Sequence, residues 1–263
     1  MTDASVWPRT LFMVRHGESA GNVARDEANA AREPVIRTSS SRDVDVPLSP
    51  LGERQATALG HWFGSLPVDQ QPTVVITSPY VRARQTTAII KNLGDFPYAS
   101  DVTSLVVDER FREKEFGILD GLTRYGIMER FPDQAAFRTS LGKFYHRPPG
   151  GESWCDVILR LRSAFEMMCR EYHGERILVV AHSVVVLCMR YIVESLTEEE
   201  ILKIDRESEV ANCSVTRFDV DQTQGPVGKL VLDSFNFVAP LLAEGARVTS
   251  TPDLPAALKP QGS

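Results

Sequence analysis

Cysteine and basic charge are both scarce in this sequence, and each shortage removes a class of protein. The four cysteines, Cys155, Cys169, Cys188 and Cys213, are scattered and form no C-x-x-C pair. Three of them lie among apolar residues, so we interpret them as buried free thiols of a protein from a reducing cytoplasm. The net charge of −6 gives no reason to expect nucleic acid or an anionic membrane as a partner.

Long apolar runs are also missing. The most apolar stretch, residues 177–193, is interrupted by a histidine, a serine and an arginine, and it is too short and too polar to span a bilayer. The first residues, MTDASVWPRT, contain no apolar segment behind a basic start, so no secretory signal is indicated. These absences predict a cytoplasmic protein without a membrane partner.

Familiar catalytic and nucleotide-binding motifs are absent as well. The chain has no G-x-x-x-x-G-K-[ST] phosphate-binding loop, no G-x-G-x-x-G dinucleotide fingerprint, no H-E-x-x-H zinc motif and no G-x-S-x-G nucleophile elbow. The enzyme classes built on those motifs therefore find no support. We expect neither a metal nor an organic cofactor.

What the sequence does contain is a regular alternation of strand and helix patterns. Short apolar runs suited to buried strands occur at residues 10–15, 73–78, 104–108 and 177–181. Segments suited to helices separate them, one of them beginning at Ser49-Pro50 with a capping serine and a proline in the first turn. This alternation predicts an α/β fold, a three-layer α/β/α sandwich around a mostly parallel central sheet.

Three segments depart from this pattern. Residues 23–46 show no sustained period and contain a Thr-Ser-Ser-Ser cluster, which predicts a long mobile loop. Residues 213–220 and 229–235, joined by a Gly-Pro turn, predict a late β-hairpin. The Ala- and Pro-rich end predicts a disordered tail over residues 249–263, which leaves a single domain over residues 1–248.

Two histidines stand at equivalent places in the strand pattern. His16 follows the strand LFMVR, and His182 follows the strand ILVVA. In open α/β sheets, ligands bind at the edge where the parallel strands have their carboxyl ends, so the fold can bring both histidines together there. Either one alone could equally be an ordinary hydrogen-bonded histidine in a turn. Two at matching strand ends, one of them preceded by Arg15, indicate a site.

The residue types around these histidines suit a phosphate. Arginine offers a planar fork of donors to phosphoryl oxygens. A helix opening at Ser183 would add backbone N–H groups and a positive dipole end. Gly17 leaves room for the backbone to approach a ligand. A histidine with one nitrogen fixed by a hydrogen bond can attack phosphorus with the other.

A second arginine and an acid would complete such a site, and the residues alone leave several candidates. Arg82 and Arg84 both lie early in the helix after the second predicted strand, and helix geometry does not choose between them. Glu109, Glu113 and Glu115 cluster after the third predicted strand, each within reach of a loop over the site. For any one of these residues, a solvated side chain is the ordinary alternative.

Six motifs in one order resemble the histidine phosphatase superfamily, which includes the cofactor-dependent phosphoglycerate mutases. They cover about residues 10–220 and are RHGESAGN, LSPLGERQA, RARQT, E-x-x-x-G-x-x-x-G from Glu113, PGGES and VVAHS. An isolated R-H-G is a weak signal, but six elements in sequence are specific. Residues 143–162 are further similar to broad-range phosphatases of this superfamily and to fructose-2,6-bisphosphatase domains.

The resemblance implies three catalytic residues. His16 would be the nucleophile that forms a phosphohistidine, and His182 would stabilise the phosphoryl group during the transfer. Glu113 would be the proton donor, because it lies four residues before Gly117 as in the family pattern.

The resemblance also implies four residues that bind the substrate. Arg15 and Arg82 would clamp the phosphoryl group, and Asn22 would reach one of its oxygens. Arg84 falls at the variable position of the R-A-x-Q-T motif, which favours Arg82. The family often has His-Gly where this chain has a serine at 183, and the backbone N–H of Ser183 would still serve.

Two departures from the mutases favour hydrolysis over transfer between sugar positions. The chain carries an insert at residues 23–46, and it reads R-E-K-E-F-G where the mutases have Glu-Arg-His-Tyr-Gly. We therefore expect a metal-independent phosphomonoesterase acting on small phosphorylated metabolites. A phosphoglycerate mutase, and an inactive module that binds a phosphorylated ligand, stay as alternatives.

The same resemblance places a helical cap over the site, at about residues 109–150. Within it, Arg124, Tyr145, His146 and Arg147 are candidate substrate contacts, although surface residues on a cap are the simpler interpretation of each. The sequence names neither the substrate nor the oligomeric state.

Overall fold

The computed structural model describes residues 6–96 and 105–250. Within them, six strands form one sheet in the order β3-β2-β4-β1-β5-β6. The strands are β1 (Thr10–Arg15), β2 (Val74–Thr77), β3 (Leu105–Val107), β4 (Arg176–Ala181), β5 (Val215–Asp221) and β6 (Lys229–Phe237). The first four run parallel, and β5 runs antiparallel to both β1 and β6. The predicted α/β fold, the late hairpin and the burial of β1, β2 and β4 are confirmed. The prediction of a buried strand over residues 104–108 is wrong as to burial, because β3 lies at the edge of the sheet with Leu105 and Val107 exposed.

Strand β1 lies inside the sheet and pairs with β4 over its whole length. The register runs from Thr10 opposite Arg176 to Arg15 opposite Ala181. The side chains of both strands are buried almost throughout, as continuous apolar runs predict for parallel strands covered on both faces. Because the two strands end level, the residues that follow them meet at the same edge of the sheet.

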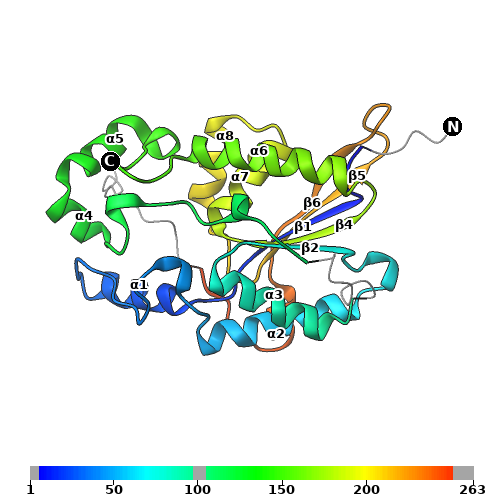
Figure 1. Cartoon of the computed structure of the whole chain (residues 1–263), viewed down its shortest axis with the longest axis horizontal. Helices are drawn as coiled ribbons and strands as arrows, with labels where there is room; N and C mark the ends of the chain where they lie inside the picture. The colour runs from blue at the N-terminus through cyan, green and yellow to red at the C-terminus, as the bar shows by residue number, and fades with distance from the viewer. Residues whose placement is uncertain (1–5, 97–104, 251–263) are drawn as a thin grey trace.

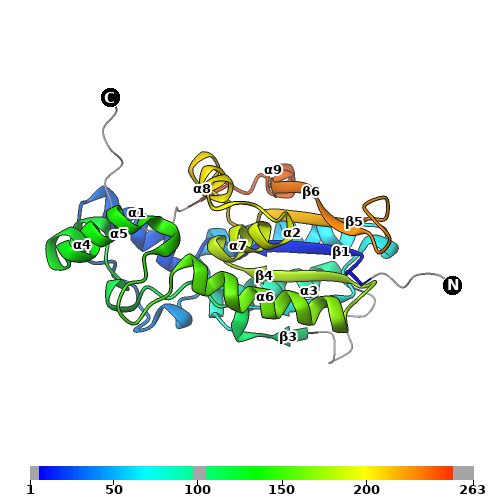
Figure 2. The same ribbon diagram turned by 90° about the horizontal axis from the view of Figure 1, so that it is seen from above.

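Helices cover both faces of the sheet, as Figures 1 and 2 show. One face carries α6 (Trp154–Glu171), α7 (Ser183–Val193) and α8 (Glu198–Glu207), and the other carries α2 (Pro50–Ser65), α3 (Val81–Gly94) and α9 (Ala239–Ala243). None of the helices in the described part of the chain combines the length and the apolar character needed to cross a membrane.

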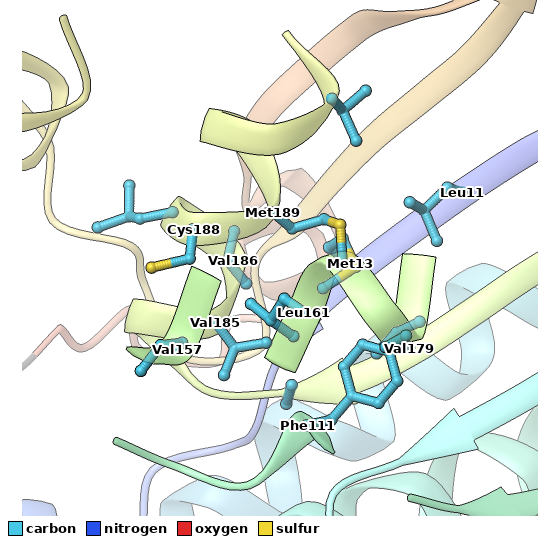
Figure 3. Close-up of a cluster of buried hydrophobic side chains, with 14 of the residues drawn as sticks. Leu11, Met13, Phe111, Val157, Leu161, Val179, Val185, Val186, Cys188 and Met189 are labelled. Carbon is cyan, nitrogen blue, oxygen red and sulfur yellow. The ribbon is translucent and has the colours of Figure 1, made fainter. Parts of the chain in front are cut away.

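Strand β1 divides its side chains between two cores with the period of a strand. Leu11 and Met13 join the cluster under α6 and α7, whereas Phe12 and Val14 join the cluster under α2 and α3. Figure 3 shows the first of these clusters, in which Leu161 of α6 packs with residues of the sheet and of α7. The two cores hold β1 rigidly from both sides, which fixes the position of the residues that follow it.

The segment after β1 is not the loop that the sequence predicts. Helix α1 (Ala20–Ala30) occupies its first part, so the prediction of a mobile loop over residues 23–46 is wrong there. A capping box starts the helix: Oγ of Ser19 accepts from the backbone N of Asn22 at 3.1 Å, and Oδ1 of Asn22 accepts from the backbone N of Ser19 at 3.0 Å. Only Asn22 and Ala28 of α1 are buried, so the sequence of this helix has no apolar stripe from which it could be predicted.

The second part of that segment packs against the cap. The cap contains α4 (Arg124–Arg130) and α5 (Pro132–Tyr145), which are separated at Phe131 and Pro132. The backbone N of Thr123 donates to the carbonyl of Pro34 at 3.1 Å, and Val35 forms a β-bridge with Leu122. Val35 also packs on a small separate core that contains Leu122. Insert and cap therefore form one structure at the edge of the sheet where the parallel strands end (Figure 1).

The end of the described chain returns to α2. Nε2 of Gln55 donates to the carbonyl of Arg247 at 2.8 Å and to Oγ1 of Thr249 at 2.9 Å. The backbone N of Asn212 donates to the carbonyl of Thr249 at 2.8 Å. Thr249, the first residue of the predicted tail, is thus hydrogen-bonded to two distant parts of the fold. Residues 251–263 of that tail lie outside the described residues.

Candidate active site

The two histidines singled out in the sequence lie side by side at the sheet edge. The centroids of the His16 and His182 rings are 5.1 Å apart, and the ring planes meet at 65°. The backbone N of His16 donates to the carbonyl of Ala181 at 2.9 Å, which extends the β1–β4 pairing by one residue. Both side chains are buried. The level ends of the two strands thus produce the pairing that the strand pattern predicts.

The ring of His16 is held in one tautomer. Its Nδ1–H donates to the carbonyl of Gly17 at 2.7 Å, so Nε2 carries the lone pair. Nε of Arg82 donates to this Nε2 at 3.2 Å. Burial lowers the pKa of His16 well below its ordinary value, and the charges of Arg82 and Arg15 lower it further. His16 is therefore a neutral imidazole whose unprotonated nitrogen faces a guanidinium.

Two glycines let the loop after β1 lie against the start of α2. A Cβ on Gly17 would lie 2.5 Å from the carbonyl oxygen of Gly52, and a Cβ on Gly52 would lie 2.0 Å from the carbonyl oxygen of Glu18. The hydroxyl of Ser49, the N-cap of α2, donates to Oε1 of Glu18 at 2.7 Å. The RHGESAGN and LSPLGERQA motifs are thus two halves of one tightly packed support beneath His16.

His182 is held between a hydroxyl and a carboxylate. Its Nε2 shares a 2.8 Å hydrogen bond with the hydroxyl of Ser78, and its Nδ1 lies 3.6 Å from Oε2 of Glu113. Burial lowers the pKa of His182 well below its ordinary value, with Arg82 and His16 adding to the effect. The imidazole is neutral, and it lies between Glu113 and His16.

The structure distinguishes between candidates that the residues alone leave open. Arg82 is buried beside His16, whereas Arg84 lies in a separate groove between α3 and β3. Of the three glutamates, only Glu113 lines the cavity at His16. Glu115 instead accepts from the hydroxyl of Tyr80 at 3.2 Å.

A small cavity joins most of the predicted site residues. It is lined by Arg15, His16, Ser19, Gly21, Asn22, Arg25, Asp43, Arg82, Glu113, Phe116, Asp120 and Ser183. Of the seven predicted residues, only His182 does not line the cavity; its ring packs against that of His16. Buried Arg15 also donates from Nη1 to the carbonyl of Val210 at 2.5 Å, which ties its guanidinium to the loop before β5.

Sequence reasoning did not assign six of the lining residues to the site. Two of them lie inside the RHGESAGN motif, Ser19 and Gly21, and the others are Arg25, Asp43, Phe116 and Asp120. Arg25 lies three positions after Asn22 on α1, so a helical reading of that segment would have placed both on one face. Burial raises the pKa of Asp120, and the nearby charge of Asp43 adds to the shift. No pattern in the sequence points to Asp43, because its contacts depend on tertiary packing alone.

The cap residues proposed as substrate contacts do not reach this cavity. Nε of Arg147 donates to Asp156 at 2.7 Å, and Nε2 of buried His146 lies 3.3 Å from Oε1 of Gln134. Tyr145 is exposed, with its ring against Phe144. Nη2 of Arg124 donates to the hydroxyl of Tyr125 at 2.6 Å. Among the described residues that line the cavity, none of these four appears.

Comparison with known proteins gives the family. A model of the histidine phosphatase superfamily (branch 1) matches residues 11–232, a range that includes both histidines, the three arginines and the glutamate of the site. The chain belongs to the histidine phosphatase superfamily. The six motifs that resemble the family all lie within the matched residues. Over residues 6–96 and 105–250, no group of three or more His, Cys, Asp and Glu residues is arranged to hold a metal ion.

Curated members of the superfamily that are similar to this chain carry different activities in their names. A 2,3-bisphosphoglycerate-dependent phosphoglycerate mutase 2 of Gloeobacter violaceus is 28% identical and covers 88% of this chain and 94% of its own. A 6-phosphofructo-2-kinase/fructose-2,6-bisphosphatase of Caenorhabditis elegans is 31% identical over 69% of this chain and 33% of its own. These names leave mutase and phosphatase activities unresolved for the chain.

Solved structures of other proteins share the fold. YhfR of Bacillus stearothermophilus superposes with a TM-score of 0.67 at 24% identity, covering 88% of this chain and 98% of its own. A mycobacterial glucosyl-3-phosphoglycerate phosphatase in complex with inorganic phosphate superposes with a TM-score of 0.64 at 23% identity, covering 88% and 99%.

The neutral histidines make stability depend on pH. Because both pKa values lie below that of an unfolded histidine, the unfolded chain binds more protons as pH falls below the ordinary value of 6.5. Stability is therefore full above that pH and falls on acidification, by at most about 1.4 kcal/mol per pH unit for each histidine. We expect the urea midpoint to fall between pH 7 and pH 5.5.

The matched comparison is a double variant, His16→Gln with His182→Gln, against His61→Gln. His61 is half-exposed and pairs with Glu244 on the surface. The double variant should lose part of the pH dependence, and His61→Gln should keep all of it. An equal pH dependence in wild type and double variant would contradict the assignment.

Proposed function

We propose that this histidine phosphatase is a metal-independent phosphomonoesterase that hydrolyses small phosphorylated metabolites through a phosphohistidine. One observation carries the proposal: Nδ1 of neutral His16 is tied to the carbonyl of Gly17, and its Nε2 faces a cavity that Arg82 and Glu113 also line. A nucleophile, a cation and an acid converge on one small space. That is the set needed to transfer a phosphoryl group to nitrogen.

The first half of the reaction transfers the phosphoryl group to His16. A bond forms between Nε2 and phosphorus while the ester P–O bond breaks, and Glu113 gives its proton to the leaving alkoxide. The guanidinium groups of Arg15 and Arg82 stabilise the charge on the phosphoryl oxygens. His182, hydrogen-bonded to Ser78, adds a positioned imidazole beside the transferring group.

The second half returns His16 to its starting state. Glu113, now ionised, takes a proton from water, and the resulting hydroxide displaces Nε2 from phosphorus to release inorganic phosphate. Oδ1 of Asn22 accepts hydrogen bonds from Ser19 at the start of α1. The side-chain amide nitrogen of Asn22 is therefore the donor available to a phosphoryl oxygen. Ser183 begins α7 and brings the positive end of that helix to the cavity.

The direct test is release of p-nitrophenol from p-nitrophenyl phosphate in the presence of EDTA. Wild-type activity that survives EDTA and vanishes in His16→Ala would establish a metal-independent histidine phosphatase. A panel of phosphorylated metabolites would then identify the substrate class. No activity in well-folded wild type would overturn hydrolysis as the function.

A phosphoglycerate mutase is the second candidate, favoured by the name of the Gloeobacter violaceus relative. Incubation with 3-phosphoglycerate and a bisphosphoglycerate primer separates the two activities. Isomerisation without net phosphate release would favour the mutase. Binding of phosphate without either reaction would favour a module that has lost turnover, although such a module has no use for the acid Glu113.

A cytoplasmic location belongs to the same proposal. All four cysteines are free thiols, with Cys188 and Cys213 buried and Cys155 and Cys169 partly buried. Free thiols persist in a reducing compartment, where small phosphorylated metabolites are also abundant. We propose no nucleic-acid or membrane partner.

Arg25 is expected to bind the substrate beside the residues that the family motifs supply. It lines the cavity, and its buried Nε makes no hydrogen bond within the described structure. A buried N–H without a partner is costly, so a substrate oxygen is its natural acceptor. We expect Arg25→Ala to raise KM for p-nitrophenyl phosphate roughly 10- to 100-fold, the range of one charge-assisted hydrogen bond.

Steady-state kinetics would check this, with Arg32→Ala as the control. Arg32 is exposed beyond the end of the same helix and should leave KM unchanged. Arg25→Lys should recover part of the loss, because it keeps the charge without the planar fork. An unchanged KM in Arg25→Ala would contradict a role in substrate binding.

A further inference from the structure

Arg82, the arginine beside the nucleophile, is already bound to a carboxylate of the protein itself. Its Nη2 donates to Oδ2 of Asp43 at 2.9 Å, and its Nη1 donates to Oδ1 of Asp43 at 3.2 Å and to the carbonyl of Asp43 at 2.8 Å. Nε donates to His16. Every nitrogen of the guanidinium therefore has a partner, and two of them point at one anionic group.

The carboxylate of Asp43 occupies the position expected for two phosphoryl oxygens. A guanidinium binds carboxylate and phosphate through the same pair of parallel N–H donors. The ring of Tyr80 lies 4.8 Å from the centre of the guanidinium and packs against it, and Arg82 is buried. The guanidinium therefore cannot easily turn to a new acceptor. A ligand must take the acceptor place that Asp43 holds.

The free space in the cavity leads to the same conclusion. Its volume is about 30 Å³, room for one or two water molecules. A phosphoryl group has four non-hydrogen atoms and brings further atoms of the substrate with it. Since Asp43 lines the cavity, the simplest way to make room is for this side chain to leave.

The charges of the site also disfavour a phosphate while Asp43 stays. Three arginines line the cavity, Arg15, Arg25 and Arg82, and three acids face them, Asp43, Glu113 and Asp120. A phosphate monoester would add negative charge directly beside the carboxylate of Asp43. Removing that carboxylate leaves an excess of positive charge, which an anionic ligand would neutralise.

We propose that Asp43 is an internal competitor for the phosphoryl site, and that a substrate binds by displacing the Asp43–Asp45 segment from Arg82. This inference rests on the proposed role of Arg82 as a phosphoryl clamp. The Arg82 site is thus already occupied by Asp43 in the free protein, and the Asp43–Asp45 segment acts as its gate.

The local structure permits this displacement. Asp43 lies in a 3-10 helix of three residues, Asp43–Asp45, and its side chain is already 35% exposed. The carboxylate of Asp45 pairs with exposed Arg42 at 2.7 Å, a surface contact that contributes little to stability and does not attach the segment to the site. Val46, which follows the segment, is buried and would hold its end in place while the segment moves.

Occupation of the Arg82 site by Asp43 predicts a measurable loss of affinity for phosphate. The apparent Kd of a ligand rises by the inverse of the open fraction, so a closed form favoured about tenfold weakens phosphate binding about tenfold. Removing the carboxylate abolishes this competition. We expect Asp43→Asn and Asp43→Ala to bind inorganic phosphate roughly tenfold more tightly than wild type.

Isothermal titration calorimetry with inorganic phosphate tests the inference without requiring turnover. The control is Asp45→Asn, which removes a carboxylate from the same short helix but outside the cavity, and it should bind phosphate as wild type does. Two variants at Asp43 guard against a local folding defect in one of them. Phosphate affinity that is unchanged or weaker in both would overturn the proposal.

Kinetics separates this inference from the proposed function. If the enzyme hydrolyses p-nitrophenyl phosphate, Asp43→Asn should lower KM and leave kcat at or above the wild-type value. A large loss of kcat with unchanged phosphate affinity would overturn the inference and assign Asp43 to the reaction. Tighter phosphate binding without any hydrolysis would support the gate and contradict the phosphatase.

Discussion

His16→Ala is expected to abolish phosphate release. Nε2 of His16 is the atom that would bond to phosphorus, and a variant without it cannot form the covalent intermediate. Removal of a covalent nucleophile costs on the order of 10⁶-fold in kcat in a well-studied hydrolase. A loss of this size would leave p-nitrophenol release at the level of the blank. Mass spectrometry of the wild type, quenched during turnover at alkaline pH, should show one added phosphoryl group that His16→Ala lacks.

The control for this loss is the same substitution at a histidine away from the site. His61 is half-exposed on α2 and pairs with Glu244, so His61→Ala should keep full activity and the phosphoryl adduct. The thermal unfolding curve of His16→Ala should remain cooperative, which separates loss of chemistry from loss of fold. Residual activity near the wild-type level would exclude His16 as the nucleophile.

Glu113→Gln is expected to produce a loss that depends on the leaving group. The glutamine keeps the size of the side chain and an oxygen to accept from the backbone N of Lys114, which Glu113 Oε1 does at 2.8 Å. It cannot supply a proton to a departing alkoxide. General acid catalysis contributes about 10²- to 10⁴-fold, so we expect a loss in this range with alkyl phosphates. With p-nitrophenyl phosphate, whose leaving group needs no proton, the loss should be much smaller.

Glu109→Gln is the matched control, because Glu109 lies on the same stretch of chain but is exposed and does not line the cavity. Its rates with both kinds of substrate should equal those of the wild type. The informative quantity is the ratio of the two rates within each variant, because that ratio cancels differences in protein quality. Equal losses on both substrates in Glu113→Gln would remove Glu113 from the role of acid.

The fold could be predicted from the sequence where each element carries its own signal. The strands that became β1 and β4 are continuous apolar runs, and both cores confirm that the runs are buried. The same signal places His16 and His182 at one sheet edge. Helix α1 carries no such signal, since its interior residues are mostly alanine and charged residues. Its start depends on the Ser19–Asn22 capping box, which sequence analysis did not recognise.

The site could be predicted only in part, for a related physical reason. Residues that follow strands or lie in motifs can be placed by topology, as Arg15, Arg82 and Glu113 show. Asp43 reaches Arg82 from a segment without any period, because the insert is folded back by its packing on the cap. Such contacts depend on how two loops lie together in space. No local pattern encodes them.

The pairing of β1 has a consequence for how the chain is made. Its two neighbours, β4 and β5, come from residues 176–181 and 215–221. The first strand to be synthesised therefore cannot pair until the last third of the chain has been made. Until then both of its edges are unpaired, and the face that packs under α6 and α7 is uncovered. Contacts between residues so far apart in the sequence form slowly. During that time an unfinished chain exposes strand edges that can pair with other chains. The nascent polypeptide therefore depends on prompt completion, or on a chaperone, to avoid aggregation.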